Sequence, residues 1–129
     1  MKTITETLNL APQGKNFLTA DWPAPANVKT LITTRNGGVS QGVYQSLNLG
    51  SHVGDDPDAV RRNREIVQEQ VGLPVAYLNQ IHSTIVVNAA DALGNTPDAD
   101  ASVDNTGKAA FAAMTADCLP VLFCDKAGT

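Results

Sequence analysis

One segment with clear helix start and stop signals constrains the fold of this chain more than any other feature. Asp56 suits the N-cap position, and Pro57 is favoured at the first position inside a helix. Gly72 fits the position after the last helical residue, and Pro74 prevents the helix from continuing. Between these signals the apolar residues recur with a period near 3.6. The sequence therefore predicts a helix over residues 57–71.

Most of the remaining chain has the composition of short strands. Residues 28–34 are rich in β-branched side chains, which favour strands, and the glycines at 37 and 38 then break the pattern with a turn. Residues 1–15 are expected to form a mobile start or a first edge strand, and residues 90–100 a loop. Further strands are predicted over residues 44–50, 75–81, 84–89, 109–114 and 120–124. One helix among several strands predicts an α+β domain with mixed β-sheet layers and flanking helices.

Composition excludes several classes of protein. The 129 residues suffice for one domain with a core, and 43% hydrophobic with 17% charged residues is typical of a globular protein. A net charge of -4 disfavours nucleic acid as a partner. The chain has neither a secretory signal pattern nor an apolar run long enough to span a membrane, and its two cysteines provide no disulfide framework. We therefore expect a reduced, cytoplasmic protein with no membrane partner.

The last residues of the chain lead to an expectation about its completeness. Residues 120–124 are apolar enough for a central strand, and residues 125–129 resemble a turn into a returning strand. A buried strand without a neighbour leaves unpaired backbone groups and an open edge. We therefore expect residues 1–129 to be a truncated single domain, with residues 1–20 peripheral, that needs a missing C-terminal half or a second chain.

Two metal-capable side chains stand beside short apolar runs. His82 follows one such run, and Cys118, preceded by Asp117, opens another. A thiolate and an imidazole brought together from two strand ends suit either a zinc site or a Cys–His nucleophilic pair. Each residue alone has a commoner explanation, a buried small apolar cysteine or a hydrogen-bonded histidine, and two ligands do not complete a tetrahedral zinc site. Similarly, Arg35 before its turn suits an anion, although an arginine ending a strand is more often only solvated.

A set of motifs in one order carries a specific resemblance. The chain resembles the laccase-domain family, once called multicopper polyphenol oxidoreductases, which includes peptidoglycan editing factors and zinc-dependent purine nucleoside phosphorylases. The resemblance covers roughly residues 20–129. The motifs are TRNGGVS at residues 34–40, SLNLG at 46–50, GD at 54–55, NR at 63–64, QIH at 80–82, ADA at 99–101 and TADCLP at 115–120.

The resemblance implies an α+β domain of about twice this length and a zinc cofactor. His82 and Cys118 match two zinc ligands of the family. The third, a histidine that normally follows the cysteine strand, has no counterpart before the sequence ends at Thr129. The implied activities are phosphorolysis of adenosine, inosine, guanosine and methylthioadenosine, with purine nucleosides and phosphate as partners, and deamination of adenosine. Arg35 is our candidate for binding phosphate, and Asp117 for orienting His82 or protonating the purine.

Two alternatives to a zinc-dependent nucleoside enzyme remain open. One is a cysteine hydrolase or amidase that edits peptidoglycan precursors, with Cys118 as nucleophile and His82 as its base. The other is a non-catalytic interaction module. Copper oxidase chemistry finds no support, because the chain lacks the paired His-x-His segments of a multicopper cluster.

Overall fold

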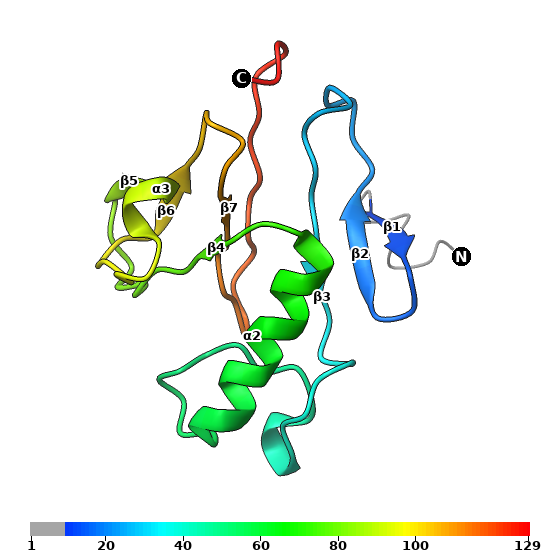
Figure 1. Cartoon of the computed structure of the whole chain (residues 1–129), viewed down its shortest axis with the longest axis vertical. Coiled ribbons are helices and arrows are strands. Elements are labelled where there is room, and N and C mark those ends of the chain that lie inside the picture. Colours follow the sequence, from blue (N-terminus) through cyan, green and yellow to red (C-terminus); the bar gives the residue numbers. More distant parts are fainter. Residues whose placement is uncertain (1–9) are drawn as a thin grey trace. The chain divides into compact units, whose positions relative to one another are not determined.

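The chain divides into two compact units that are described separately. A computed structural model describes residues 10–129 (Figure 1). One unit comprises the described chain up to Val67 together with Phe123–Thr129, and the other comprises Gln68–Leu122. Within residues 10–129, neither α-helix has the length and apolar character needed to cross a membrane. Antiparallel and parallel strand pairs occur together with helices, so the α+β class is confirmed.

The first unit contains a small antiparallel sheet in the order β1-β2-β3. A tight turn at Gly14, whose φ is 66°, joins β1 (Leu10–Gln13) to β2 (Phe17–Ala20). β2 also pairs with β3 (Ile32–Thr33). β1 is the edge strand and carries Pro12, which cannot donate a ladder hydrogen bond. This confirms the edge strand expected within residues 1–15, although residues 1–9 lie outside the described chain.

The long helix has the bounds that its sequence signals predict. α2 spans Pro57–Val71, and the Asp56 side chain accepts the N–H of Asp58 at 3.0 Å, as an N-cap does. Gly72 follows in the left-handed region, with φ 80°, and its N–H donates back to the Gln68 carbonyl. The buried residues of the helix are Val60, Asn63 and Val67.

The second unit combines two short parallel strand pairs with one short helix. β4 (Val75–Ala76) pairs with β7 (Ala110–Phe111), and β5 (Val86–Asn88) pairs with β6 (Ala101–Val103). α3 (Ala89–Ala92) follows β5 directly and contacts both β5 and β4 (Figure 1). Small side chains dominate the core and let these elements approach closely. The core consists of Ala76, Leu78, Ala89, Ala92, Ala99 and Ala109.

Two predicted strands are wrong. Residues 44–50 do not form a strand, because the 3-10 helix η1 (Gly42–Tyr44) and a turn occupy this region. Residues 120–124 are not a strand either, because no strand of residues 10–129 pairs with them. Their large side chains are exposed, with Phe123 at 85%. The preceding Leu119 is 79% exposed. A sequence pattern identifies residues suited to a strand, but a strand also needs a partner.

Other strands are shorter than predicted or were missed. The segments 28–34, 75–81, 84–89 and 109–114 contain β3, β4, β5 and β7, each only two or three residues long. β2 and β6 were not predicted, because a few residues carry too little periodicity. The predicted loop 90–100 begins inside α3. Long-range side-chain hydrogen bonds replace strand ladders in several of these segments.

Candidate functional site

The segment that carries His82 is held by one carboxylate. Asp100 accepts the backbone N–H groups of Ile81 at 3.0 Å, His82 at 2.9 Å and Ser83 at 2.8 Å. It also accepts the Ser83 hydroxyl at 2.9 Å. Three successive N–H groups directed at one anion form a nest, the arrangement that proteins use to bind anions. Here the anion is a side chain of the chain itself, so the loop around His82 is fixed without a strand or helix.

Electrostatics agree with this geometry. Hydrogen bonds from Ser83 first, and then from Ile81 and His82, lower the pKa of Asp100 to about 2, although desolvation opposes them. The carboxylate is therefore ionised at neutral pH and acts only as an acceptor. It stabilises a backbone conformation that is uncommon for a residue with a side chain, because His82 has φ 59°.

The imidazole of His82 is available for other interactions. The residue is exposed, and within residues 10–129 its ring has no hydrogen-bond partner. The backbone bonds to Asp100 therefore fix the start of the side chain and leave both ring nitrogens free. A histidine that binds a metal ion or acts as a base needs a fixed backbone and a free ring nitrogen, and His82 has both.

Gln80 joins the segment of His82 to the segment that leads to Cys118. Its side-chain amide donates to the Met114 carbonyl at 2.8 Å, and its side-chain oxygen accepts the Met114 N–H at 2.7 Å. Gln80 precedes His82 by two positions, and Met114 precedes Cys118 by four. This reciprocal pair brings the two predicted motif segments together within one compact unit.

Cys118 and Asp117 lie in a bend after this anchor. Cys118 is a free, exposed thiol, so the buried apolar cysteine of the commoner interpretation does not apply. Asp117 is also exposed, and within the described chain no hydrogen bond joins its carboxylate to His82. The carboxylate bound to the His82 backbone is that of Asp100 instead.

The donor atoms present suit part of a zinc site. Imidazole nitrogen and thiolate sulfur are typical zinc ligands, and both side chains are accessible. Residues 10–129 contain no group of three or more His, Cys, Asp or Glu residues that could hold a metal ion. His82 and Cys118 are therefore suited to be two ligands of a zinc ion, and the described residues do not make a complete zinc site.

Arg35 belongs to the other compact unit, where it organises a loop. Its Nε donates to the Gln45 carbonyl at 3.0 Å, and its own carbonyl accepts the N–H groups of Ser46 at 2.7 Å and Leu47 at 2.9 Å. The residue is exposed, and within residues 10–129 its terminal guanidinium nitrogens have no hydrogen-bond partner. Arg35 can thus present N–H donors to an anion from a fixed loop.

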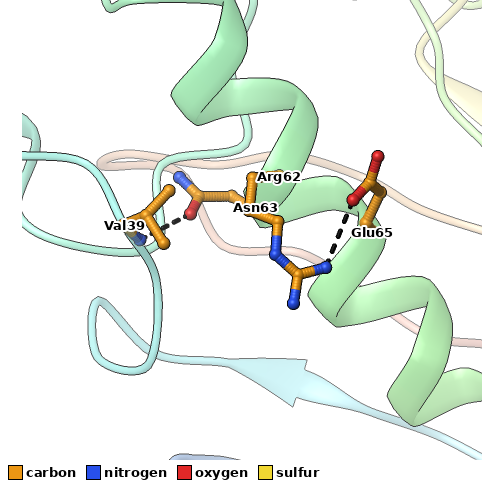
Figure 2. A network of polar contacts seen from close by, with 4 residues as sticks. All are labelled: Val39, Arg62, Asn63 and Glu65. Carbon is orange, nitrogen blue, oxygen red and sulfur yellow. Dashed lines mark hydrogen bonds and ion pairs between the residues drawn. The ribbon is translucent and has the colours of Figure 1, made fainter.

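A buried amide connects this loop region to α2. Asn63 is fully buried, and its side-chain oxygen accepts the Val39 N–H at 2.8 Å (Figure 2). Its amide donates to the Ser40 hydroxyl and to the Asn48 carbonyl, both at 2.8 Å. Figure 2 also shows the Arg62–Glu65 ion pair on the same helix, whose side chains are exposed, unlike the buried Asn63. Its N–O distance is 3.2 Å. Motifs separated in the sequence therefore meet at one side chain.

Asp55 and Gly38 complete this polar network. Asp55 accepts the Ser40 hydroxyl at 2.6 Å and the Asn48 amide at 3.1 Å, and its pKa is lowered mainly by the bond from Ser40. Gly38 packs so closely that an added Cβ would overlap the Ser46 carbonyl oxygen. These residues hold the loop together, which explains why the motif positions include small and amide side chains.

Sequence reasoning missed the holding roles of Asp100, Gln80 and Asn63. All three lie inside motifs that carried the resemblance, but no role was assigned to them there. An aspartate between two alanines has no local feature that names its partner 18 positions away. The signal available in the sequence was the motif itself, and the interaction became visible only in the fold.

Comparison with known proteins identifies the family. Residues 29–129 match the family described as multi-copper polyphenol oxidoreductase laccase. A purine nucleoside phosphorylase of Pseudomonas aeruginosa is 50% identical over 113 residues, which are 88% of this chain and 46% of that protein. Purine nucleoside phosphorylase YfiH of Escherichia coli is 45% identical over 115 residues, which are 88% of this chain and 47% of that protein.

Solved structures agree with the sequence comparison. A crystal structure of a Neisseria meningitidis protein is 89% identical, with a TM-score of 0.88, over 89% of this chain and 48% of that chain. YlmD from Geobacillus stearothermophilus is 26% identical, with a TM-score of 0.70, over 80% of this chain and 43% of that one. The chain thus spans about half the length of the relatives it matches. It belongs to the multi-copper polyphenol oxidoreductase laccase family, as its motifs indicate.

Proposed function

We propose that the protein is a zinc-dependent purine nucleoside phosphorylase. The observation that carries the proposal is the Gln80–Met114 pair, which brings the segments of His82 and Cys118 together in a chain whose relatives are named purine nucleoside phosphorylases. The proposed substrates are purine nucleosides and inorganic phosphate. Because this chain spans less than half of those relatives, the activity is proposed for the full-length protein.

His82 and Cys118 are the proposed zinc ligands from this chain. Both present their donor atoms at the surface of one compact unit, and each lies on a segment fixed by side-chain hydrogen bonds. When bound, zinc would act as a Lewis acid that stabilises developing negative charge on the reacting group. The remaining ligand or ligands are proposed to come from outside the described residues.

Phosphorolysis places two further demands on the protein. A phosphate oxygen forms a bond to ribose C1′ while the bond from C1′ to the purine nitrogen breaks, and the departing purine takes up a proton. Arg35 is the proposed phosphate-binding group, because its guanidinium presents donors in a planar fork that matches phosphate oxygens. This role requires the terminal nitrogens that no residue of the described chain occupies.

Asp117 is the proposed proton donor to the purine. Asp100 cannot fill this role, because its carboxylate accepts four hydrogen bonds and its pKa is lowered to about 2. Within the described residues the Asp117 carboxylate accepts no hydrogen bond, and it is exposed beside Cys118. We also propose adenosine deamination as a second activity. That reaction uses water in place of phosphate, so it does not need Arg35.

The test compares Cys118→Ala with Cys124→Ala in the natural full-length form of the protein. Both cysteines are free and exposed and lie six positions apart, which makes the second a matched control. Adenine and ribose 1-phosphate formed from adenosine and phosphate are measured by chromatography, together with zinc content. Cys118→Ala should lower zinc content and phosphorolysis severely, and Cys124→Ala should preserve both.

Two results would contradict the proposal. Equal activity of Cys118→Ala and the parent protein would remove Cys118 from the site. Full phosphorolysis after zinc is removed with a chelator would show that the reaction does not need the metal.

A further inference from the structure

The backbone of His82 needs outside support to hold its conformation. A residue with a Cβ is uncommon at φ 59°, because the left-handed region costs on the order of 1 kcal/mol relative to the usual one. Neither a helix nor a strand includes residues 81–83. The N–H groups of these three residues all donate to the Asp100 carboxylate, and backbone bonds to Ile85 hold the segment only further along.

The two carboxylate oxygens of Asp100 accept different numbers of hydrogen bonds. Oδ1 accepts the N–H groups of Ile81 and Ser83 and the Ser83 hydroxyl. Oδ2 accepts the N–H of His82. The His82 N–H, and with it the direction of the Cα–Cβ bond, is therefore controlled by an oxygen that makes no other hydrogen bond within the described chain.

We propose that Asp100 is the positioning residue for His82: it holds the histidine backbone in the left-handed conformation that presents the imidazole to the metal. The inference rests on the proposed role of His82 as a zinc ligand. Outer groups that orient a metal ligand typically affect metal affinity by about 10- to 100-fold when they are removed. Asp100 differs from the usual case because it acts through the backbone and leaves both ring nitrogens free.

Asp104 in the same compact unit provides a matched control. Its carboxylate accepts the N–H groups of Thr106 at 3.2 Å and Gly107 at 2.8 Å and the Thr106 hydroxyl at 2.7 Å. It organises an exposed turn in the same way, but this turn carries none of the proposed site residues. A loss that follows from any disrupted aspartate turn would appear at both positions.

The informative substitution is Asp100→Asn. The amide oxygen of asparagine can keep the three hydrogen bonds made by Oδ1. The NH2 group that replaces Oδ2 is a donor, so it cannot accept the His82 N–H. Asp100→Asn should therefore release the His82 N–H while it keeps most of the local fold. Asp100→Ala removes every bond and tests the larger loss, and Asp104→Asn is the control for both.

Two measurements on the full-length protein test the inference. Amide hydrogen exchange at His82, measured without metal, should be faster in Asp100→Asn and unchanged in Asp104→Asn. Zinc titration by calorimetry should show affinity about 10- to 100-fold weaker in Asp100→Asn only, with the thermal midpoint close to that of Asp104→Asn. Unchanged exchange at His82, or equal zinc affinity in the two asparagine variants, would overturn the positioning role.

The result separates this inference from the proposed function. If the parent protein binds no zinc, the proposed function fails while hydrogen exchange still reports whether Asp100 holds His82. If the parent binds zinc and Asp100→Asn binds it equally well, the function stands and the positioning role is wrong.

Discussion

Replacing the buried Asn63 by alanine should be among the most destabilising single changes in this chain. The side chain is fully buried and makes three hydrogen bonds of 2.8 Å. Alanine removes all three and leaves the Val39 N–H and the Asn48 carbonyl without the partners they have in the parent. The Ser40 hydroxyl still donates to Asp55, so it is not left without a partner.

The expected magnitude follows from the number of orphaned groups. A buried polar group that loses its hydrogen bond costs about 1 to 3 kcal/mol, and these two backbone groups are only partly buried. We therefore take about 1 to 2 kcal/mol for each and expect Asn63→Ala to lower the free energy of unfolding by about 2 to 4 kcal/mol. The lost packing volume adds to this value rather than reducing it.

Urea-induced unfolding of the full-length protein, followed by circular dichroism, measures this change. The control is Arg61→Ala on the same helix, because the Arg61–Asp58 pair is 70% and 76% exposed and such pairs contribute about 0 to 1 kcal/mol. A loss below 1 kcal/mol in Asn63→Ala, or one equal to that of the control, would refute the argument that this amide holds the loop to the helix.

Four further outcomes are expected. Arg35→Ala should reduce phosphorolysis more than adenosine deamination, whereas Arg61→Ala should change neither; equal losses in the two reactions would contradict a phosphate-binding role. The lowered pKa of Asp55 means that its ionised form is favoured by folding, so its contribution is present above the ordinary value of 3.8 and is lost as pH falls below it. Thermal midpoints measured across this range should fall less in Asp55→Asn than in the parent. Gly38→Ala should destabilise the protein in urea unfolding, because its Cβ would overlap a backbone oxygen; a stability equal to the parent would show that the loop can shift. Residues 1–129 expressed alone should self-associate in sedimentation experiments, because Leu119, Val121, Leu122 and Phe123 are 79%, 62%, 42% and 85% exposed; a monodisperse monomer with a sharp unfolding transition would contradict this.

The candidate site shows how far motif reasoning reaches. The resemblance indicated which segments matter, and the Gln80–Met114 pair places two of them together. The resemblance did not assign a role to Asp100, whose hydrogen bonds to residues 81–83 span 17 to 19 positions of sequence. The zinc ligands, the phosphate group and the proton donor remain predictions, each with a variant that tests it.

Local sequence signals specify the long helix. Its N-cap, its first-turn proline and its terminal glycine act through hydrogen bonds and dihedral limits within a few residues of Asp56 and Gly72. Such local interactions are already specified by neighbouring residues, so α2 has the predicted bounds Pro57–Val71. The α+β class followed from this helix together with the strand-like composition of several other segments.

Contacts between segments distant in the sequence select the strands and the polar side-chain bonds. Strand formation depends on a partner that is distant in sequence. For this reason residues 44–50 hold only the end of a 3-10 helix and a turn, and residues 120–124 are unpaired within the described chain. The bonds of Asn63 and Asp100 likewise join residues up to 24 positions apart. No local pattern names such a partner, because a single polar side chain fits many environments, and only the fold selects which donors and acceptors it meets.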